Sequence, residues 1–254
     1  WSSDVCSSDL AGAVPYYVRE SVPPAVLARL HQPGSAEAAA AIANANVDGG
    51  ADIIKLFTGS WVTNQQAVPM PVDIARAAVD AAHRRGRLVF SHASNVEGLQ
   101  VAIDTGVDVI AHVIDDTRGL TRGHLEQMVA RKMSLIPTLT VVGGRQETLD
   151  ELRQFREAGG QVLFGTDAGY IQTYSPLQEY AWLARAGLTW RDVLASLTTN
   201  AAARFGESAT RGEVKAGMAA DLVILRGDPE RDVRALADVR MTIRGGEVIY
   251  DAPR

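Results

Sequence analysis

The chain has 254 residues, of which 46% are hydrophobic and 22% are charged, a balance typical of a folded globular protein rather than a disordered one. Its formal net charge of -5 gives no basic surface for phosphate backbones, which argues against a nucleic-acid partner and favours a small-molecule substrate. No apolar run reaches the roughly 18 residues that a membrane helix needs, so we expect no membrane partner.

The first ten residues, WSSDVCSSDL, have no hydrophobic period and, read back into codons, resemble a widely used sequencing-adapter oligonucleotide. We therefore expect residues 1–10 to be an adapter scar and the natural gene to begin upstream. Cys6, the single cysteine, lies in this scar, so any metal ion must be held by nitrogen and oxygen donors. Because a signal peptide could have stood upstream, a secreted or periplasmic location stays open beside a slightly favoured cytoplasmic one.

After a proline-rich entry, short apolar runs alternate with helical patterns, which is the rhythm of parallel βα units. Uniformly apolar runs are typical of strands buried on both faces, as in an all-parallel sheet or barrel. The segment PVDIARAAVDAAHRRG predicts a helix with one apolar stripe, ended by Gly86. The predicted strands are ADIIKLF, GRLVFSH, GVDVIAH, MSLIPTLTVV and GQVLFGTD.

The last quarter of the chain changes character. TWRDVLASLTTNAAARFG predicts a final pair of helices, whereas GEVKAGMAADLVILRGD and VRMTIRGGEVIYD predict short strands joined by glycine and aspartate turns. We therefore expect the βα units to occupy residues 11–212 and a small β subdomain to occupy residues 213–254.

Four of the apolar runs end in one conspicuous polar residue: Lys55, His92, His112 and Asp167. In a βα barrel the C-terminal ends of the strands converge on one mouth, so we expect these side chains to cluster. Singly, each also has a structural explanation as a helix cap, a core histidine or a lysine extending to solvent. Together they favour a metal site, because two imidazoles and a carboxylate suit Zn, Fe or Mn. A buried lysine needs a partner or neutralisation, and a neutral amine can add carbon dioxide to give a metal-bridging carbamate.

These motifs resemble the amidohydrolase superfamily, in particular the branch related to imidazolonepropionase and metal-dependent Xaa-Pro dipeptidases. The resemblance covers the chain after residue 11, and its most specific part is the closing helix followed by a G-x-V-x-x-G-x-x-ADLV strand entry. It implies a TIM (βα)8 barrel, incomplete at its N-terminal side, with part of a small C-terminal β-sandwich subdomain. The matching pieces are GADIIKLF, SHASNVEGLQVAIDTGVDVIAH, FGTDAG and TTNAAARFG followed by GEVKAGMAADLVIL.

The resemblance also implies roles for the four polar residues. Lys55 is similar to the carbamylated lysine after strand four, and His92 and His112 to the metal ligands after strands five and six. Asp167 is similar to the strand-eight aspartate, which touches the metal and acts as general base. The implied cofactors are one or two divalent metal ions, with zinc favoured over iron or manganese, which activate a bound water and polarise the scissile carbonyl.

The family's His-x-His pair at the end of strand one is absent from this sequence. We therefore expect a truncated copy of an enzyme gene that is inactive and poorly soluble alone, because an unclosed sheet exposes its edge.

Other candidate residues have weaker signals. We expect His31 and His83 to be solvated and His124 to lie at the surface, with a substrate contact as the alternative for His124. Trp61 and Tyr170 follow strand ends and are predicted to line the substrate pocket, although simple packing or exposure explains them equally well.

The sequence therefore predicts a metal-dependent hydrolase of amide-type C–N bonds that uses metal-activated water on a cyclic amide or a dipeptide. Whether it assembles as a homo-oligomer stays open. One rival interpretation is a Schiff-base lyase of the aldolase type with Lys55 as the amine nucleophile. A second is a non-catalytic barrel that serves as an assembly subunit.

Overall fold

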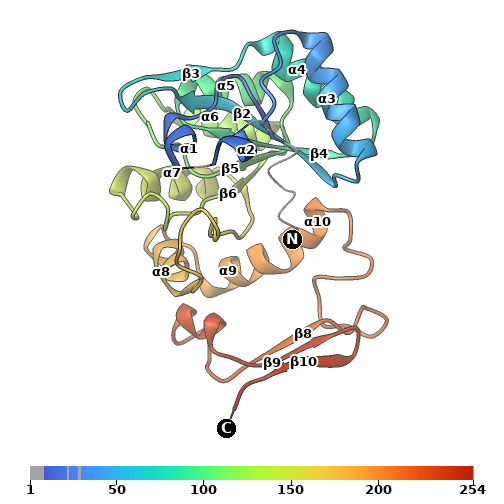
Figure 1. The fold of residues 1–254 in the computed structure, drawn as a ribbon. Helices are drawn as coiled ribbons and strands as arrows, with labels where there is room; N and C mark the ends of the chain where they lie inside the picture. Colours follow the sequence, from blue (N-terminus) through green and yellow to red (C-terminus); the bar gives the residue numbers. More distant parts are fainter. Residues whose placement is uncertain (1–8, 22, 28–29, 254) are drawn as a thin grey trace. The chain divides into compact units, whose positions relative to one another are not determined.

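The structure is a computed structural model that describes residues 9–21, 23–27 and 30–253 (Figure 1). It divides into two units, Trp1–Leu135 and Ile136–Arg254. Among the described residues, none of the helices has the length and apolar character required to cross a lipid bilayer.

The first unit is built on a sheet of parallel strands. The carboxyl ends of these strands share one edge, because neighbouring strands run in the same direction. A short strand, β3 (Ala67–Pro69), folds back antiparallel onto the end of β2. The parallel strands pair in the order β1 (Asp9–Ala11), β2 (Ile53–Trp61), β4 (Leu88–Ala93) and β5 (Val109–Ala111), and the start of β6 (Ser134–Ile136) follows β5.

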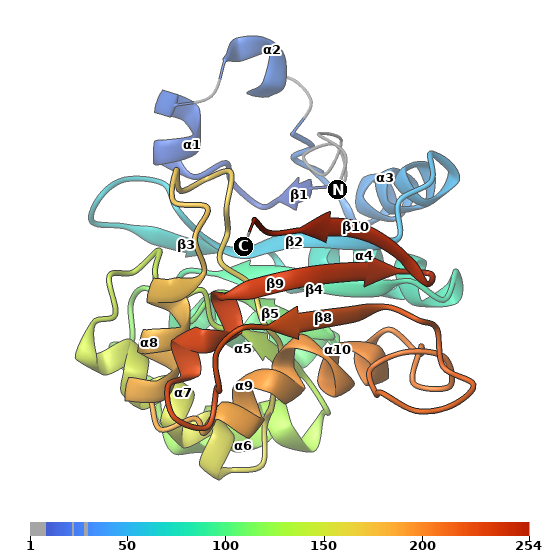
Figure 2. The ribbon, with the colours of Figure 1, turned by 90° about the horizontal axis from the view of Figure 1, so that it is seen from below.

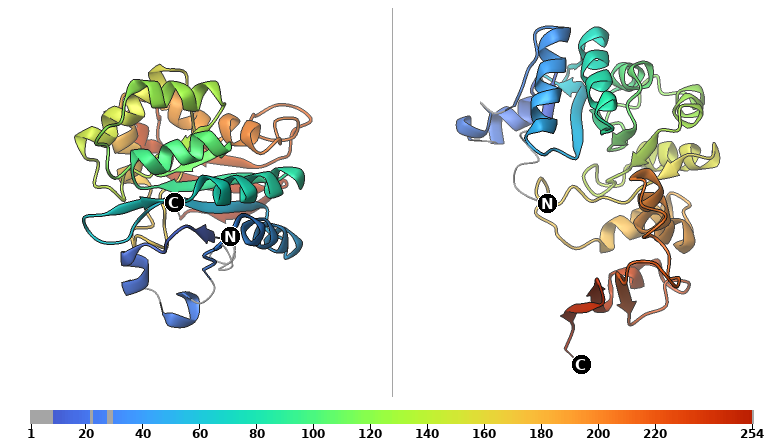
Figure 3. Two further views of the ribbon diagram at one scale, coloured as in Figure 1. Left: turned by 90° about the horizontal axis from the view of Figure 1, so that it is seen from above. Right: turned by 90° about the vertical axis from the view of Figure 1, so that its right-hand side faces the viewer.

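Helices connect these strands, as the alternating pattern predicts. Helix α4 buries one alanine-rich stripe that includes Ile74, Ala78 and Ala82, and Gly86 follows its end with a φ of 66° that suits glycine. It packs beside α3, and Figure 3 shows the two side by side in blue and teal. The helices of this unit are α1 (Tyr16–Ser21), α2 (Pro24–Leu27), α3 (Ala36–Asp48), α4 (Val72–Arg84), α5 (Val96–Thr105) and α6 (Arg122–Ala130).

Strand β1 includes two residues that the sequence assigns to the adapter scar. The backbones of Asp9 and Leu10 pair in parallel with Lys55 and Leu56 of β2, and the Leu10 side chain is fully buried. The other residues of that stretch, 1–8, lie outside the described residues. The end of the decapeptide is therefore part of the folded sheet.

The second unit begins with a strand that is shorter than its apolar run. Strand β6 ends at Ile136, and residues 139–144 form turns rather than the strand expected across MSLIPTLTVV. Pro137 explains the end, because proline has no amide hydrogen with which to continue the ladder. The next strand of the sheet, β7 (Gln161–Val162), is shorter still.

The rest of the second unit follows the predicted pattern closely. The final helix pair is confirmed as α9 (Trp190–Leu197) and α10 (Thr199–Arg204), and the terminal strands form an antiparallel sheet in the order β10-β9-β8 (Figure 2). Gly245 and Gly246 join β9 to β10 with φ values of 59° and 87°, as a two-residue hairpin turn requires. The remaining elements are α7 (Gln146–Glu157), α8 (Leu177–Arg185), β8 (Leu222–Leu225), η2 (Val233–Ala237), β9 (Val239–Arg244) and β10 (Glu247–Asp251).

Candidate active site

Strand register places a lysine, a phenylalanine and a histidine on one face of the first sheet. Lys55 and Phe57 alternate along β2 with the buried Ile54 and Leu56, and Phe57 pairs with His92 on β4. The Lys55 Nζ lies 5.4 Å from the centroid of the Phe57 ring, and that centroid lies 5.1 Å from the centroid of the His92 ring. Phe57 thus forms an apolar wall beside both polar groups.

His92 and His112 come together at the carboxyl ends of β4 and β5. Their ring centroids are 4.9 Å apart and their planes cross at 65°. His92 pairs with Ala111, the residue directly before His112, so the parallel register brings the two rings to the same edge. The structure thus brings together two of the four residues that the sequence predicts to cluster.

Burial keeps both imidazoles neutral at neutral pH. Burial, and to a smaller extent the nearby positive charge of Lys55, together lower the pKa of His92 to about 3. The pKa of His112 is also well below its ordinary value, mainly through burial and then through His92 and Lys55. Neutral imidazoles keep a ring lone pair, which is the form that binds a metal ion. Because Lys55 lowers the pKa of both histidines, its charge lies within electrostatic range of both rings.

A serine that sequence reasoning missed contacts the first histidine. The Nε2 of His92 lies 3.0 Å from the Ser94 Oγ, which donates to the Gly59 carbonyl oxygen at 3.1 Å. Ser94 is fully buried. Its position two residues after His92 is the one signal that the sequence offers, and it does not predict which carbonyl lies opposite.

Two glycines allow the segment after β4 to lie against β2. A Cβ on Gly98 would lie 2.6 Å from the Gly59 Cα, and a Cβ on Gly59 would lie 2.8 Å from the Asn95 Oδ1. Asn95 is the N-cap of α5 and accepts from the Gly98 amide at 3.0 Å. The absence of both side chains therefore brings the start of α5 close to the end of β2.

The two predicted pocket aromatics lie in different units. Trp61 ends β2, and its Nε1 donates to the Asp115 Oδ2 at 3.3 Å, which links the segments that follow Lys55 and His112. Tyr170 lies in the second unit and is 57% exposed. Substrate contact by either residue stays a prediction.

Each of the three remaining histidines contacts a neighbouring protein group. His83 is exposed, as expected, and its Nε2 lies 2.8 Å from the Asp108 Oδ2. His124 caps its own helix, because its Nδ1 accepts from the Thr121 amide at 3.0 Å. His31 is half-buried rather than fully solvated, and its carbonyl accepts from the Ala11 amide at 2.9 Å.

Asp167 follows β7 in a left-handed backbone conformation with a φ of 58°. Its carbonyl oxygen accepts from the Tyr170 and Ile171 amides, each at 3.2 Å, in a tight turn. Among the described residues, four that are not glycine have positive φ, and three of them, His112, Thr138 and Asp167, follow β5, β6 and β7. Such backbone strain concentrates at functional sites. Asp167 belongs to the second unit, and its proximity to the histidine pair stays a prediction.

The imidazole nitrogens of the first unit are donors of a type that binds metal ions. Two neutral imidazoles side by side match the ligands that zinc, iron and manganese accept. The described residues contain no group of three or more His, Cys, Asp or Glu that could hold a metal ion. That Lys55, as a carbamate, and Asp167 complete the ligand set stays a prediction.

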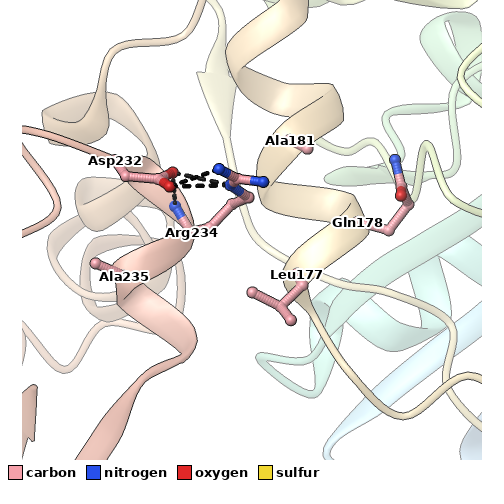
Figure 4. A pocket seen from close by; sticks show the side chains of 6 residues that line it. All are labelled: Leu177, Gln178, Ala181, Asp232, Arg234 and Ala235. Atoms are coloured by element: carbon pink, nitrogen blue, oxygen red, sulfur yellow. Dashed lines mark hydrogen bonds and ion pairs between the residues drawn. The ribbon is translucent and has the colours of Figure 1, made fainter. Parts of the chain in front are cut away.

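A cavity of about 410 Å³ lies elsewhere, within the second unit (Figure 4). Asp232 and Arg234 on its wall pair with each other at 2.7 Å between Oδ2 and Nη2. None of the predicted site residues lines it, so it is separate from the candidate active site. Its lining is Leu177, Gln178, Ala181, Asp232, Arg234 and Ala235.

Comparison with known proteins gives a family match and several relatives. Residues 10–249 match the model of the amidohydrolase family. An uncharacterized protein of Mycobacterium tuberculosis is 28% identical over 211 residues, which cover 75% of this chain and 56% of that protein. The chain thus spans little more than half the length of the curated relatives that it matches.

Solved structures show the same fold. A Xaa-Pro dipeptidase with bound methionine in its active site superposes with a TM-score of 0.77 at 23% identity, covering 87% of this chain and 59% of that one. A prolidase candidate from Bifidobacterium longum gives a TM-score of 0.75 at 27% identity, with 89% and 62% covered. The α/β architecture is that of the amidohydrolase TIM barrels. With the family match extending over nearly its whole length, the chain belongs to the amidohydrolase family.

Proposed function

We propose that the protein is a metal-dependent hydrolase of amide-type C–N bonds, with dipeptides or cyclic amides as substrates. The observation that carries the proposal is the pair of neutral imidazoles, His92 and His112, held 4.9 Å apart beside the charge of Lys55. Family membership supports the reaction class, and the likeness to a Xaa-Pro dipeptidase supports dipeptides as the first substrates to test.

Four residues would hold one or two divalent metal ions, with zinc as the first candidate and iron or manganese as alternatives. His92 and His112 would bind through ring nitrogens and Asp167 through a carboxylate oxygen. Lys55 would bind as a carbamate, formed when its neutral amine attacks carbon dioxide and loses a proton. When bound, such ions supply Lewis-acid polarisation of the scissile carbonyl and lower the pKa of water.

The protein's own residues account for proton transfer and substrate placement. Asp167 takes the proton from the attacking water and hands it to the leaving nitrogen as the C–N bond breaks. Trp61, which is anchored to Asp115, and Tyr170, which is exposed, would contact the substrate. Burial of the histidine pair keeps both rings unprotonated across the neutral pH range.

The test is hydrolysis of a panel of Xaa-Pro dipeptides and cyclic amides by this chain joined to the N-terminal portion of a relative, with and without a chelator. We expect turnover that a chelator abolishes and Zn²⁺, Fe²⁺ or Mn²⁺ restores. Trapping of a carbonyl substrate on Lys55 by borohydride, with activity insensitive to chelator, would overturn the proposal in favour of a Schiff-base lyase. Tight metal binding without hydrolysis of any amide would overturn it in favour of a non-catalytic barrel.

A further inference from the structure

We propose that Ser94 is a positioning residue that fixes His92 in the tautomer with its proton on Nε2, leaving the lone pair of Nδ1 for a metal ion. The inference about the tautomer is independent of the reaction, whereas its link to a metal ion rests on the proposed function.

The hydrogen bonds around Ser94 form a short buried chain. The Ser94 Oγ lies 3.0 Å from the His92 Nε2 and 3.1 Å from the Gly59 carbonyl oxygen. Ser94 is fully buried and His92 is 9% exposed, so water cannot easily replace either contact. Within the part of the chain that the structure describes, Ser94 is the hydrogen-bond partner of the His92 ring, and it contacts Nε2 rather than Nδ1.

The number of protons available to these hydrogen bonds selects one tautomer of His92. A serine hydroxyl has a single proton to donate, and a neutral imidazole has a single N–H. If the hydroxyl donated to Nε2, its oxygen would face the Gly59 carbonyl at 3.1 Å with no proton between two acceptors, a repulsive contact. If the hydroxyl donates to the carbonyl and accepts from Nε2–H, each contact has its proton. The second arrangement satisfies the buried groups, so the ring proton lies on Nε2.

The carbonyl that selects the tautomer is itself held firmly. Gly59 sits where the pairing of β2 with β4 shifts register, and its carbonyl also accepts from the Ser94 amide at 3.2 Å. A carbonyl oxygen has two lone pairs, so it accepts from both donors of Ser94. Gly98 lies directly against this segment, since an added Cβ would lie 2.6 Å from the Gly59 Cα, so the segment cannot move toward α5. Hydrogen bonds of this kind commonly orient histidine ligands of metal sites.

The first experiment reads the tautomer directly. The metal-stripped protein is labelled with ¹⁵N-histidine, and long-range ¹H–¹⁵N spectra are recorded at neutral pH. The His92 signals are assigned by their loss in His92→Gln. We expect a pyrrole-like Nε2 and a pyridine-like Nδ1. The opposite pattern in the unmodified protein would overturn the proposal, and this readout needs no variant of Ser94 to fold.

The second experiment compares two serine variants by the same spectra and by titration with Zn²⁺ alone. Ser94→Ala should mix the two tautomers of His92 and weaken Zn²⁺ binding about 10- to 100-fold. Ser91→Ala is the matched control, because Ser91 is equally buried and directly precedes His92 on β4 but bonds to Thr58 and to backbone carbonyls. It should change neither readout.

Identical spectra and Zn²⁺ affinities for Ser94→Ala and Ser91→Ala would overturn the positioning role. Neither measurement uses a substrate. A protein with the expected tautomer that hydrolyses no amide would therefore support this inference and contradict the proposed function alone.

Discussion

The ring centroids of His92 and His112 lie 4.9 Å apart because Ala111, which precedes His112, pairs with His92 across β4 and β5. The approach of the two rings is therefore a property of the sheet. A metal ion bound between them would be placed by backbone hydrogen bonds, whose geometry changes little when surface residues vary.

In the chain joined to the N-terminal portion of a relative, we expect Lys55→Ala to lose most of its bound metal and its hydrolase activity, because it removes the carbamate that we assign as a bridging ligand. Short carboxylic acids such as acetate should restore part of both by occupying the vacated place. Metal content and dipeptide hydrolysis are measured with and without added acid. Lys215→Ala, at an exposed position, is the matched control and should behave like the unmodified protein. Full metal content in Lys55→Ala would rule out Lys55 as a ligand.

In the same joined protein, Asp167→Asn should keep much of its bound metal and lower kcat about 10²- to 10⁴-fold, because an amide can contact a metal but cannot accept the proton of the attacking water. Metal analysis and steady-state kinetics on one preparation separate the two effects. Asp73→Asn, on the exposed first turn of α4, provides the control. A normal kcat for Asp167→Asn would mean that another group is the base.

Glu179 provides a test of stability in the second unit. Its carboxylate is buried on α8 and accepts from the Leu139 amide at 2.8 Å and from the Thr140 amide and hydroxyl at 2.8 and 2.7 Å. Glu179→Ala leaves buried donors unpaired, and each costs about 1–3 kcal/mol of unfolding free energy. Urea unfolding should therefore show a clear loss of stability in this variant, and an unchanged midpoint would contradict the role of Glu179 as a clamp.

The same residue predicts a pH dependence. Burial raises the pKa of Glu179 above its ordinary value of 4.5, although its three hydrogen bonds oppose the shift. As pH rises, the folded state therefore keeps a proton that the unfolded state has already lost. The contribution of this carboxyl group to the free energy of unfolding is present below pH 4.5 and is lost as pH rises through the folded pKa. The free energy of unfolding is measured against pH for the unmodified protein and for Glu179→Gln. The two plots should differ in slope across this pH range, and parallel plots would contradict the raised pKa.

The approach of Gly59 and Gly98 predicts a further loss of stability. Gly98→Ala places a Cβ 2.6 Å from the Gly59 Cα, a backbone atom that cannot easily move, and should cost about 1–3 kcal/mol. Gly34→Ala is the control, because nothing lies within 4 Å of the added Cβ. Thermal unfolding of both variants is the measurement, and equal melting temperatures would show that the segment after β4 can shift without cost.

Sequence patterns determined much of the architecture, because periodicity and turn chemistry are local. The apolar stripe of α4, the pairing of α9 with α10 and the Gly245–Gly246 hairpin all form as their residues predict. The strands also begin in their expected apolar runs. The prediction of a long strand at β6 was wrong, because Pro137 has no amide hydrogen and the hydrogen-bond ladder ends there although the sequence stays apolar.

Tertiary structure alone decided which side chains meet. The meeting of Ser94 with Gly59 depends on strand register and on two glycines that permit a close approach, neither of which a pattern along the chain reveals. The sequence likewise places His124 at the surface with a substrate contact as the alternative, but it does not reveal that the ring caps its own helix through Thr121. The sequence by itself identifies His92 and His112 as candidate ligands. Only the parallel register of β4 and β5 determines that their rings share one edge of the sheet. Register is set by packing across the whole sheet, which no local pattern reveals.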